Sequence, residues 1–349
     1  PFFGRVSLKE KMFFTRNLAI MIASGISLPR ALKKLAEQTK SKKFKIVLID
    51  ITEGINKGES FYQTLSRHQD IFSELFQSMI KVGEEAGTLE NVLRVLTEQM
   101  EKENEMRSKI ISALIYPAVI VAIMFAIGIL MLAIVVPKLA ETFKELNIEL
   151  PFTTKLVIFI GTFIYKKWYF VLLIIITFLI LLRIILKSKL GKRFRDYFVL
   201  KIPLISDIVR KSNSAITART LSSLLIAGVP LVRSLEIVSP TLGNIYFREA
   251  LGEVAEKVKK GEKIYQALNR YQNLYPSLVL EMMEIGEETG ETSSILAKLA
   301  DFYEEEVANI TKNLSAVIEP LLMVFIAIVV GFFAISMLQP MYSMLRALQ

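Results

Sequence analysis

Three long apolar runs interrupt a chain that is otherwise amphipathic. Residues 113–136, 168–186 and 316–338 contain almost no charged side chains. A helix rises about 1.5 Å per residue, so each run is long enough to cross the roughly 30 Å hydrocarbon core of a bilayer. All three lie far from the N-terminus, so none of them is a secretory signal peptide. The pattern therefore predicts three transmembrane helices.

Between these runs the apolar residues recur at helical spacing. Leu28, Leu32 and Leu35 share one helix face, and so do Leu89, Leu93 and Leu96. No window alternates convincingly with the period of two that a half-buried strand would show. We expect an all-α integral membrane protein whose polar segments are small antiparallel helical bundles.

The chain also matches itself at an offset of 203 residues without a gap. The matching positions include the pairs Gly25 and Gly228, Gly83 and Gly286, Gly87 and Gly290, and Pro117 and Pro320. Such self-similarity is the signature of an internal repeat. We expect repeat 1 at residues 1–112 and repeat 2 at residues 187–315, each followed by a span. The unpaired span, residues 168–186, then returns the chain across the membrane.

Lysine and arginine cluster after the second span and predict the orientation. Cytoplasmic loops carry the excess of these residues, and residues 183–211 hold the densest group. This places both repeats and the N-terminus in the cytoplasm. The loop at residues 137–167 and the tail at residues 339–349 are then extracytoplasmic.

Composition narrows the chemistry. The chain is 52% apolar and 22% charged, with no cysteine and one histidine. Thiolate and multi-histidine metal sites are therefore excluded, and no sequence pattern for nucleotide binding or hydrolysis occurs. His68 aligns with Tyr271 of the other repeat, so we interpret it as a surface or helix-end residue. We expect no enzymatic activity, no cofactor, no metal and no catalytic residue.

The net charge of +9 does not indicate nucleic acid as a partner. Acidic and basic residues nearly balance within each repeat, whereas a DNA-binding domain needs a basic face. The segments around Gly25 and Gly228 could be mistaken for a DNA-binding helix-turn-helix. We interpret them as helical hairpins in which each glycine caps a helix in the left-handed conformation.

Two acidic turns carry the most distinctive pattern of the chain. In both repeats two glycines, four residues apart, bracket two glutamates: Gly83, Glu84, Glu85 and Gly87, and Gly286, Glu287, Glu288 and Gly290. A tight helix–helix turn explains the glycines. For the glutamates we predict a contact with a partner protein, and a divalent-cation site is the weaker alternative.

Acidic runs and prolines mark the approach to the first and third spans. We expect the runs at residues 101–105 and 304–306 to form a solvated helix face. Pro117 and Pro320 lie at matching points, where a proline either opens a helix or introduces a kink. The sequence leaves these two alternatives open.

Several stretches, taken in order along the chain, resemble the inner-membrane platform proteins of type IV pili and type II secretion systems. They are FTRNLAIMIASGISLPRAL (14–32), VGEEAGTLENVL (82–93), LIYP (114–117), VVPKLAETF (135–143), ARTLSSLLIAGVPL (218–231), IGEETG (285–290) and IEP (318–320). The resemblance implies two helical cytoplasmic domains in a non-enzymatic inner-membrane protein that forms a homodimer or a larger oligomer.

The resemblance also implies partners and a role. Such a platform couples a cytoplasmic hexameric assembly or retraction ATPase to the insertion or extraction of pilin or pseudopilin subunits. Its further implied partners are other inner-membrane assembly proteins and membrane lipid. We expect a platform of a type IV pilus machine, with the equivalent type II secretion platform as the alternative. A transporter or channel is disfavoured because the spans hold almost no charge.

Overall fold

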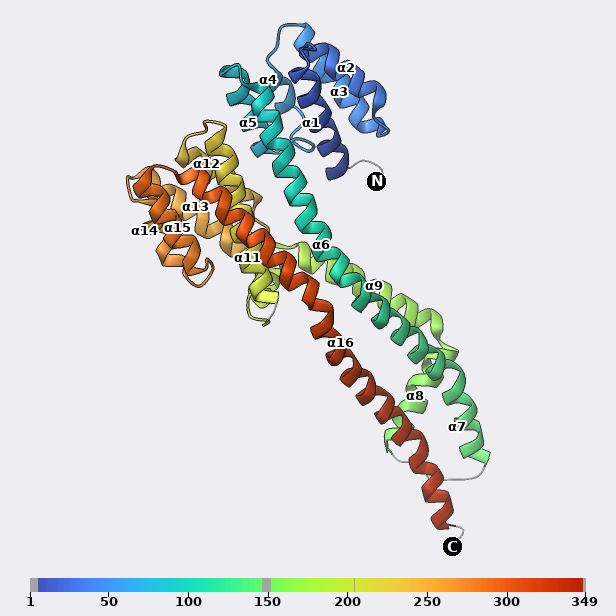
Figure 1. Cartoon of the computed structure of the whole chain (residues 1–349). Coiled ribbons are helices and arrows are strands. Elements are labelled where there is room, and N and C mark those ends of the chain that lie inside the picture. The colour runs from blue at the N-terminus through green and yellow to red at the C-terminus, as the bar shows by residue number, and fades with distance from the viewer. Residues whose placement is uncertain (1–5, 146–151, 204, 348–349) are drawn as a thin grey trace. The chain divides into compact units, whose positions relative to one another are not determined.

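The computed structural model describes residues 6–145, 152–203 and 205–347, and every regular element within them is a helix (Figure 1). Repeat 1 contains α1 (Leu8–Ala23), α2 (Leu28–Gln38), α3 (Lys42–Asn56), α4 (Phe61–Ser66), α5 (Glu74–Glu85) and the start of α6 (Leu89–Leu130). Then follow η1 (Met131–Val135), α7 (Val136–Glu145), α8 (Phe152–Lys166), α9 (Trp168–Lys187) and α10 (Lys189–Val199). Repeat 2 contains α11 (Ile205–Ile226), α12 (Leu231–Val238), η2 (Ser239–Thr241), α13 (Ile245–Lys259), α14 (Ile264–Leu268), η3 (Asn269–Tyr271), α15 (Ser277–Thr289) and the start of α16 (Thr292–Ala347). The all-α prediction is confirmed.

The helices of the two repeats correspond one to one. The helices α2 to α6 and α12 to α16 begin at positions separated by the same 203 residues, for example Lys42 and Ile245, or Leu89 and Thr292. The duplication in the sequence is therefore a duplication of structure.

Glycines end the first helix of each repeat as expected. Gly25 has a φ of 76° and Gly228 a φ of 89°, both in the left-handed region that side chains disfavour. The next helices begin after Ser27 and Pro230. The two hairpins predicted from the sequence are thus present.

The repeats have aromatic cores at equivalent places. In repeat 1 the rings of Phe14 and Phe44 lie 5.4 Å apart, and Phe72 packs 6.0 Å from Phe14. In repeat 2 Phe247 packs edge-on against Tyr275 at 5.0 Å. The position of Phe14 is taken there by Thr217, whose hydroxyl lies 3.2 Å from that of Tyr275.

Tyr275 therefore replaces a ring contact of repeat 1 with a buried hydrogen bond. Its side chain is fully buried. Burial raises the pKa of Tyr275 far above its usual value, so the phenol stays protonated.

The last helix of each repeat continues into an apolar span without a break. α6 is 42 residues long and contains Pro117 in its interior. α16 is 56 residues long and runs through Pro320. Neither proline begins a helix, which removes one of the two alternatives open from the sequence.

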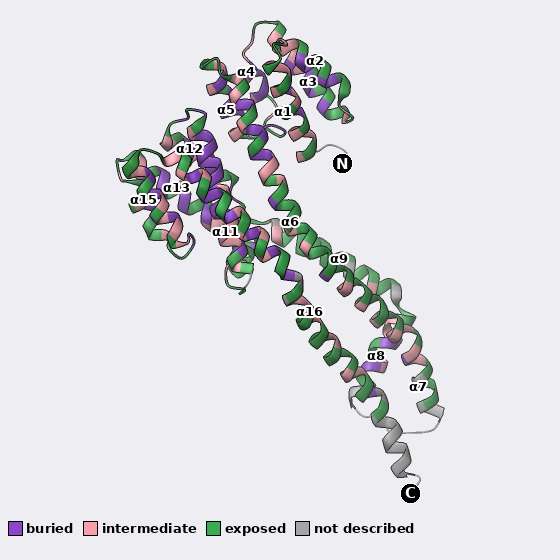
Figure 2. Cartoon of the chain, in the orientation of Figure 1, coloured by how far each residue is buried: buried purple, intermediate pink, exposed green. Residues whose placement is uncertain are grey.

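The spans expose their apolar side chains, as Figure 2 shows for α9. Within the part of the chain that the structure describes, three helical segments are able by length and composition to cross a membrane: Leu89–Thr142, Tyr169–Leu186 and Thr292–Ser336. An exposed apolar surface of this extent requires lipid or protein around it. The three predicted spans are therefore confirmed as helices suited to a membrane.

Residues 137–167, expected as a loop, are largely helical. α8 packs against the π-helical turn η1, where Val136 and Val157 are buried together. A Cβ on Gly161 would lie 2.6 Å from the carbonyl oxygen of Leu132, so only glycine permits this approach. The helix is interrupted between α8 and α9 at Lys167, whose backbone leaves the helical conformation.

We predict that Gly25→Ala and Gly228→Ala each lower the free energy of unfolding by roughly 1 to 2 kcal/mol, because alanine must adopt a left-handed conformation. Gly252→Ala is the matched control, since it lies within α13, where a Cβ would make an ordinary contact at 3.5 Å. Denaturant unfolding of the detergent-solubilised chain, followed by circular dichroism, measures these effects. Equal destabilisation by all three substitutions would contradict the prediction.

Candidate functional site: the acidic turns and the seam between the repeats

The glycines of the two acidic turns have different roles. Gly87 and Gly290 have φ values of 68° and 75° and reverse the chain between the flanking helices. Gly83 and Gly286 are helical and lie at a close approach. A Cβ on Gly83 would lie 2.8 Å from a methyl of Val92, and one on Gly286 would lie 3.0 Å from the Cα of Thr292. The expectation of tight helix–helix turns is confirmed.

The two glutamates of each turn differ as well, because one of them binds a helix inside its own repeat. The backbone N–H groups of Phe61 and Tyr62 donate to the two carboxylate oxygens of Glu84 at 2.6 and 2.9 Å. In repeat 2 the backbone N–H of Ile264 donates to one carboxylate oxygen of Glu287 at 3.3 Å. The first N–H groups of a helix have no partner within it, and a carboxylate satisfies them and complements the helix dipole.

Glu85 and Glu288 face solvent instead. The Glu85 side chain is 67% exposed and lies 3.9 Å from Lys81 one helical turn earlier. Glu288 is also exposed. The predicted partner contact thus remains a prediction for the acidic turns, and within each turn the second glutamate is the one presented at the surface.

His68 has a structural counterpart in the other repeat. Its Nε2 lies 2.8 Å from a carboxylate oxygen of Asp50 on α3. At the equivalent positions of repeat 2 the Tyr271 hydroxyl donates to Glu253 on α13. Both pairs tie the segment after the fourth helix to the third helix. No group of metal-ligating side chains suited to an ion occurs among the residues described.

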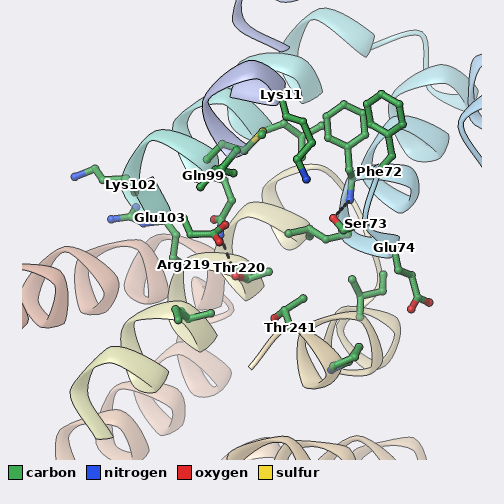
Figure 3. Close-up of a pocket in the computed structure, with 18 of the residues that line it drawn as sticks. Lys11, Phe72, Ser73, Glu74, Gln99, Lys102, Glu103, Arg219, Thr220 and Thr241 are labelled. Carbon is green, nitrogen blue, oxygen red and sulfur yellow. Dashed lines mark hydrogen bonds between the residues drawn. The ribbon is translucent and has the colours of Figure 1, made fainter. Parts of the chain in front are cut away.

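Repeat 1 and repeat 2 meet along a seam that the sequence does not reveal. Residues 1–108 and 193–309 form one compact unit. Gln99 on α6 donates to the hydroxyl of Thr220 on α11 at 3.0 Å and accepts a hydrogen bond from Ser223 at 3.1 Å. Figure 3 shows Gln99 and Thr220 facing one another across this seam. All three side chains are buried.

A network of charges extends the seam. Arg219 binds both carboxylate oxygens of Glu304, at 2.9 and 3.0 Å, and also bonds Asp301. From repeat 1, Lys102 approaches Asp301 and Glu304 at 3.5 Å each. A two-pronged guanidinium–carboxylate pair is the geometry that gives a strong and oriented ion pair.

The network lowers the pKa of Asp301, its most exposed carboxylate. Burial would raise the pKa of Asp301, but the hydrogen bonds and charges of Arg219 and Lys102 outweigh this and hold that pKa below its usual value. The stability that Asp301 contributes is therefore present at neutral pH and is lost as the pH falls through the lowered pKa.

The equivalent ion pair in repeat 1 is exposed. Arg16 and Glu101 occupy the positions of Arg219 and Glu304, and they lie 3.4 Å apart with side chains 64% and 43% exposed. The Arg219 and Glu304 side chains are only 9% and 14% exposed. We expected the acidic runs before the spans to be solvated, and for Glu304 this is wrong because Arg219 and Lys102 pair with it and its side chain is only 14% exposed.

A cavity of about 380 Å³ adjoins the seam (Figure 3). Lys11 lines it together with Phe72, Gln99 and Thr220. The ammonium of Lys11 donates to the carbonyl oxygen of Ile71 at 3.0 Å, and burial lowers its pKa. Lys11, Arg219 and Glu304 line this cavity, and each binds another group of the protein. Such a cavity is typical of an interface between two domains.

Comparison with known proteins gives this architecture a family. Residues 14–137 and 217–340 each match the family model described as Type II secretion system (T2SS), protein F. The chain belongs to this protein F family. Each matched stretch contains one helical bundle and the span that follows it, and the two are separated by the same 203 residues as the structural repeats. Helices α8 to α10 of this protein F family member fall between the matched stretches.

Relatives from two kinds of machine share this family. The Type IV pilus assembly protein PilC of Thermus thermophilus is 33% identical over 341 residues, which cover 98% of this chain and 84% of that protein. PilC of Myxococcus xanthus is 32% identical over 349 residues, covering 100% and 84%. The Type II secretion system protein F of Aeromonas hydrophila is 32% identical over 340 residues, covering 97% and 87%. The similarity shows the family and does not separate pilus from secretion system.

For the acidic turns we predict that Glu84→Ala lowers the free energy of unfolding by about 1 to 2 kcal/mol, because two N–H groups at the start of α4 lose their acceptor. Glu85→Ala is the control and changes it by less than about 0.5 kcal/mol, since its ion pair is exposed. Thermal and denaturant unfolding of the full chain measure both. Equal effects at the two neighbours would contradict the assignment.

For the seam we predict that Arg219→Ala lowers the free energy of unfolding by about 3 kcal/mol, because it removes the two-pronged partner of the Glu304 carboxylate and leaves only the more distant Lys102. The equivalent exposed substitution, Arg16→Ala, costs less than about 1 kcal/mol. Combining Arg219→Ala with Glu304→Ala then costs less than the sum of the single changes. Strict additivity in this double-mutant cycle would show that the pair contributes nothing.

Proposed function

We propose that this chain is the inner-membrane platform of a type IV pilus assembly machine. It couples a cytoplasmic hexameric ATPase to the insertion or extraction of pilin subunits. In this role it has no enzymatic activity and binds no cofactor. The two repeats lie in the cytoplasm, and the C-terminal tail lies on the other side of the membrane.

The continuity of α6 and α16 is the observation that carries this proposal. Each helix begins inside a polar bundle and ends as a membrane span, with no loop between the two parts. A hydrogen-bonded helix is stiff along its axis, so a displacement of the bundle is passed to the span. A machine that converts ATPase motion into movement within a membrane requires such a connection.

The exposed glutamates are the proposed point of contact with the ATPase. Glu85 and Glu288 lie at equivalent positions of the two acidic turns, and both face solvent. Glu84 and Glu287 hold helices of their own repeat, so they shape these turns from within. We further propose that the platform is a homodimer or larger oligomer surrounded by membrane lipid and other inner-membrane assembly proteins.

The equivalent platform of a type II secretion system is the alternative. Its support is the similarity to the Aeromonas hydrophila protein F, which equals that to the Myxococcus xanthus PilC in percentage identity. Deletion of the gene distinguishes the two: loss of surface pili with normal secretion favours the pilus machine. Loss of secreted enzymes with normal pili favours the secretion system instead.

We predict that replacing residues 108–110 by three glycines abolishes assembly or secretion. These residues lie within α6, at the point where the chain passes from one compact unit to the other. Each glycine in a helix interior costs roughly 1 kcal/mol relative to alanine, so the substitution softens the connection. The matched control replaces the same residues by three alanines and retains function. Complementation of a deletion strain, with membrane levels checked by immunoblot, measures the effect.

Equal activity of the glycine and alanine variants would show that a stiff connection is unnecessary.

Charge reversal at Glu85 and Glu288 tests the proposed contact with the ATPase separately. It should prevent co-purification with the ATPase while the protein still folds and inserts. Retained co-purification would overturn the contact assignment and leave the platform function standing.

A further inference from the structure

Helix α10 exposes an apolar face that an ordinary surface helix buries. Leu190 and Phe194 are 84% and 67% exposed, and Tyr197 and Phe198 on the same face are 47% exposed each. Asp196, on the opposite face, is only 5% exposed. A helix on a water-soluble domain buries its apolar stripe and exposes its charges. The exposed apolar stripe indicates that water is not the medium on the outer face of α10.

The face of α10 opposite the apolar stripe, which carries Asp196, is bonded to repeat 2. The backbone N–H of Ile245, at the start of α13, donates to the Asp196 carboxylate at 2.9 Å. The side chain of Asn244 donates to the Asp196 carbonyl oxygen at 3.2 Å. Arg193 pairs with Glu249 on α13 at 3.2 Å. These specific contacts fix the orientation of α10, so its apolar face is held outward.

The junction with α9 places α10 at the end of a membrane span. Only Ser188 separates the two helices, and its extended backbone ends α9. The Ser188 hydroxyl accepts a hydrogen bond from the N–H of Gly191 at 3.0 Å. A Cβ on Gly191 would lie 1.8 Å from the carbonyl oxygen of Ile185, so this tight change of direction requires glycine.

Basic side chains flank the outward face. At about 100° of rotation per residue, Arg193 and Arg195 lie on either side of the stripe formed by Leu190 and Phe194. The stretch 189–201 holds five basic residues and one acidic residue. Aromatic and leucine side chains bounded by lysine and arginine are typical of helices that lie in the membrane interface.

We propose that α10 lies in the membrane surface and binds anionic phospholipid. Leu190, Phe194 and Phe198 insert at the boundary between head groups and acyl chains, while Lys201 and the half-exposed side chains of Arg193 and Arg195, which also pair with Glu249 and Asp196, contact the lipid phosphates. α10 follows the span of α9 with only Ser188 between them, and Asp196 accepts a hydrogen bond from the start of α13. This site lies outside the stretches that match the family model and is independent of which machine the chain serves.

The absence of cysteine from the chain allows a direct test. The full protein carrying Phe194→Cys is labelled with an environment-sensitive fluorophore and reconstituted into phosphatidylcholine vesicles with or without phosphatidylglycerol. Ile46→Cys is the matched control, because Ile46 is 68% exposed on repeat 1. We expect a blue shift, and quenching by lipids spin-labelled near the head group, at position 194 only. Leu190→Cys provides a second reporter should Phe194→Cys perturb folding.

The charge contribution is tested in the Phe194→Cys background. Each basic residue near an anionic surface is worth about fivefold in binding. Arg195→Gln combined with Lys201→Gln, which leaves the Arg193–Glu249 pair in place, should therefore raise the phosphatidylglycerol fraction needed for half-maximal quenching several-fold. Quenching that is independent of phosphatidylglycerol and of these substitutions would overturn the anionic-lipid site. A water-like signal at both reporters in every vesicle would overturn the membrane location and leave the face to a protein partner.

Discussion

Backbone hydrogen bonding inside a hydrocarbon layer is the constraint on which the rest of this structure depends. No water is present there to bond a free peptide group, so each span must satisfy its own N–H and C=O groups as a helix. In α6 and α16 the helix that meets this requirement begins among polar residues and passes Pro117 or Pro320 without ending. The preceding five helices of each repeat assemble beside the polar end of that helix.

Much of this fold could be predicted because its signals are local or repetitive. The spans follow from uninterrupted apolar runs, and the duplication follows from glycines and prolines at one offset. Gly25, Gly87 and their counterparts reveal turns because few other residues adopt a positive φ. The sequence also directed attention to the acidic turns, and the structure shows how their glutamates divide between an internal and an external role.

The rest could not be predicted because it depends on contacts between distant segments. Nothing local distinguishes Glu84 from Glu85, although only Glu84 reaches the start of α4. Likewise, Arg16 and Arg219 are the same residue in equivalent helices, yet only Arg219 is buried. The exposed apolar face of α10 could not be predicted for a similar reason, since a helical period identifies an apolar face without saying what medium surrounds it.

The seam also records how far the two halves have diverged since duplication. Gln99 meets Thr220 and Ser223, whereas the equivalent positions in the opposite repeats hold Phe302, Asn17 and Ile20. A chain built from two copies of repeat 1 would set Gln99 against Asn17 and Ile20. A chain built from two copies of repeat 2 would bring Phe302 against the two hydroxyls. Neither of these chains reproduces the hydrogen bonds of Gln99 with Thr220 and Ser223. The two repeats are therefore no longer interchangeable, and the contact between them depends on their order along the chain.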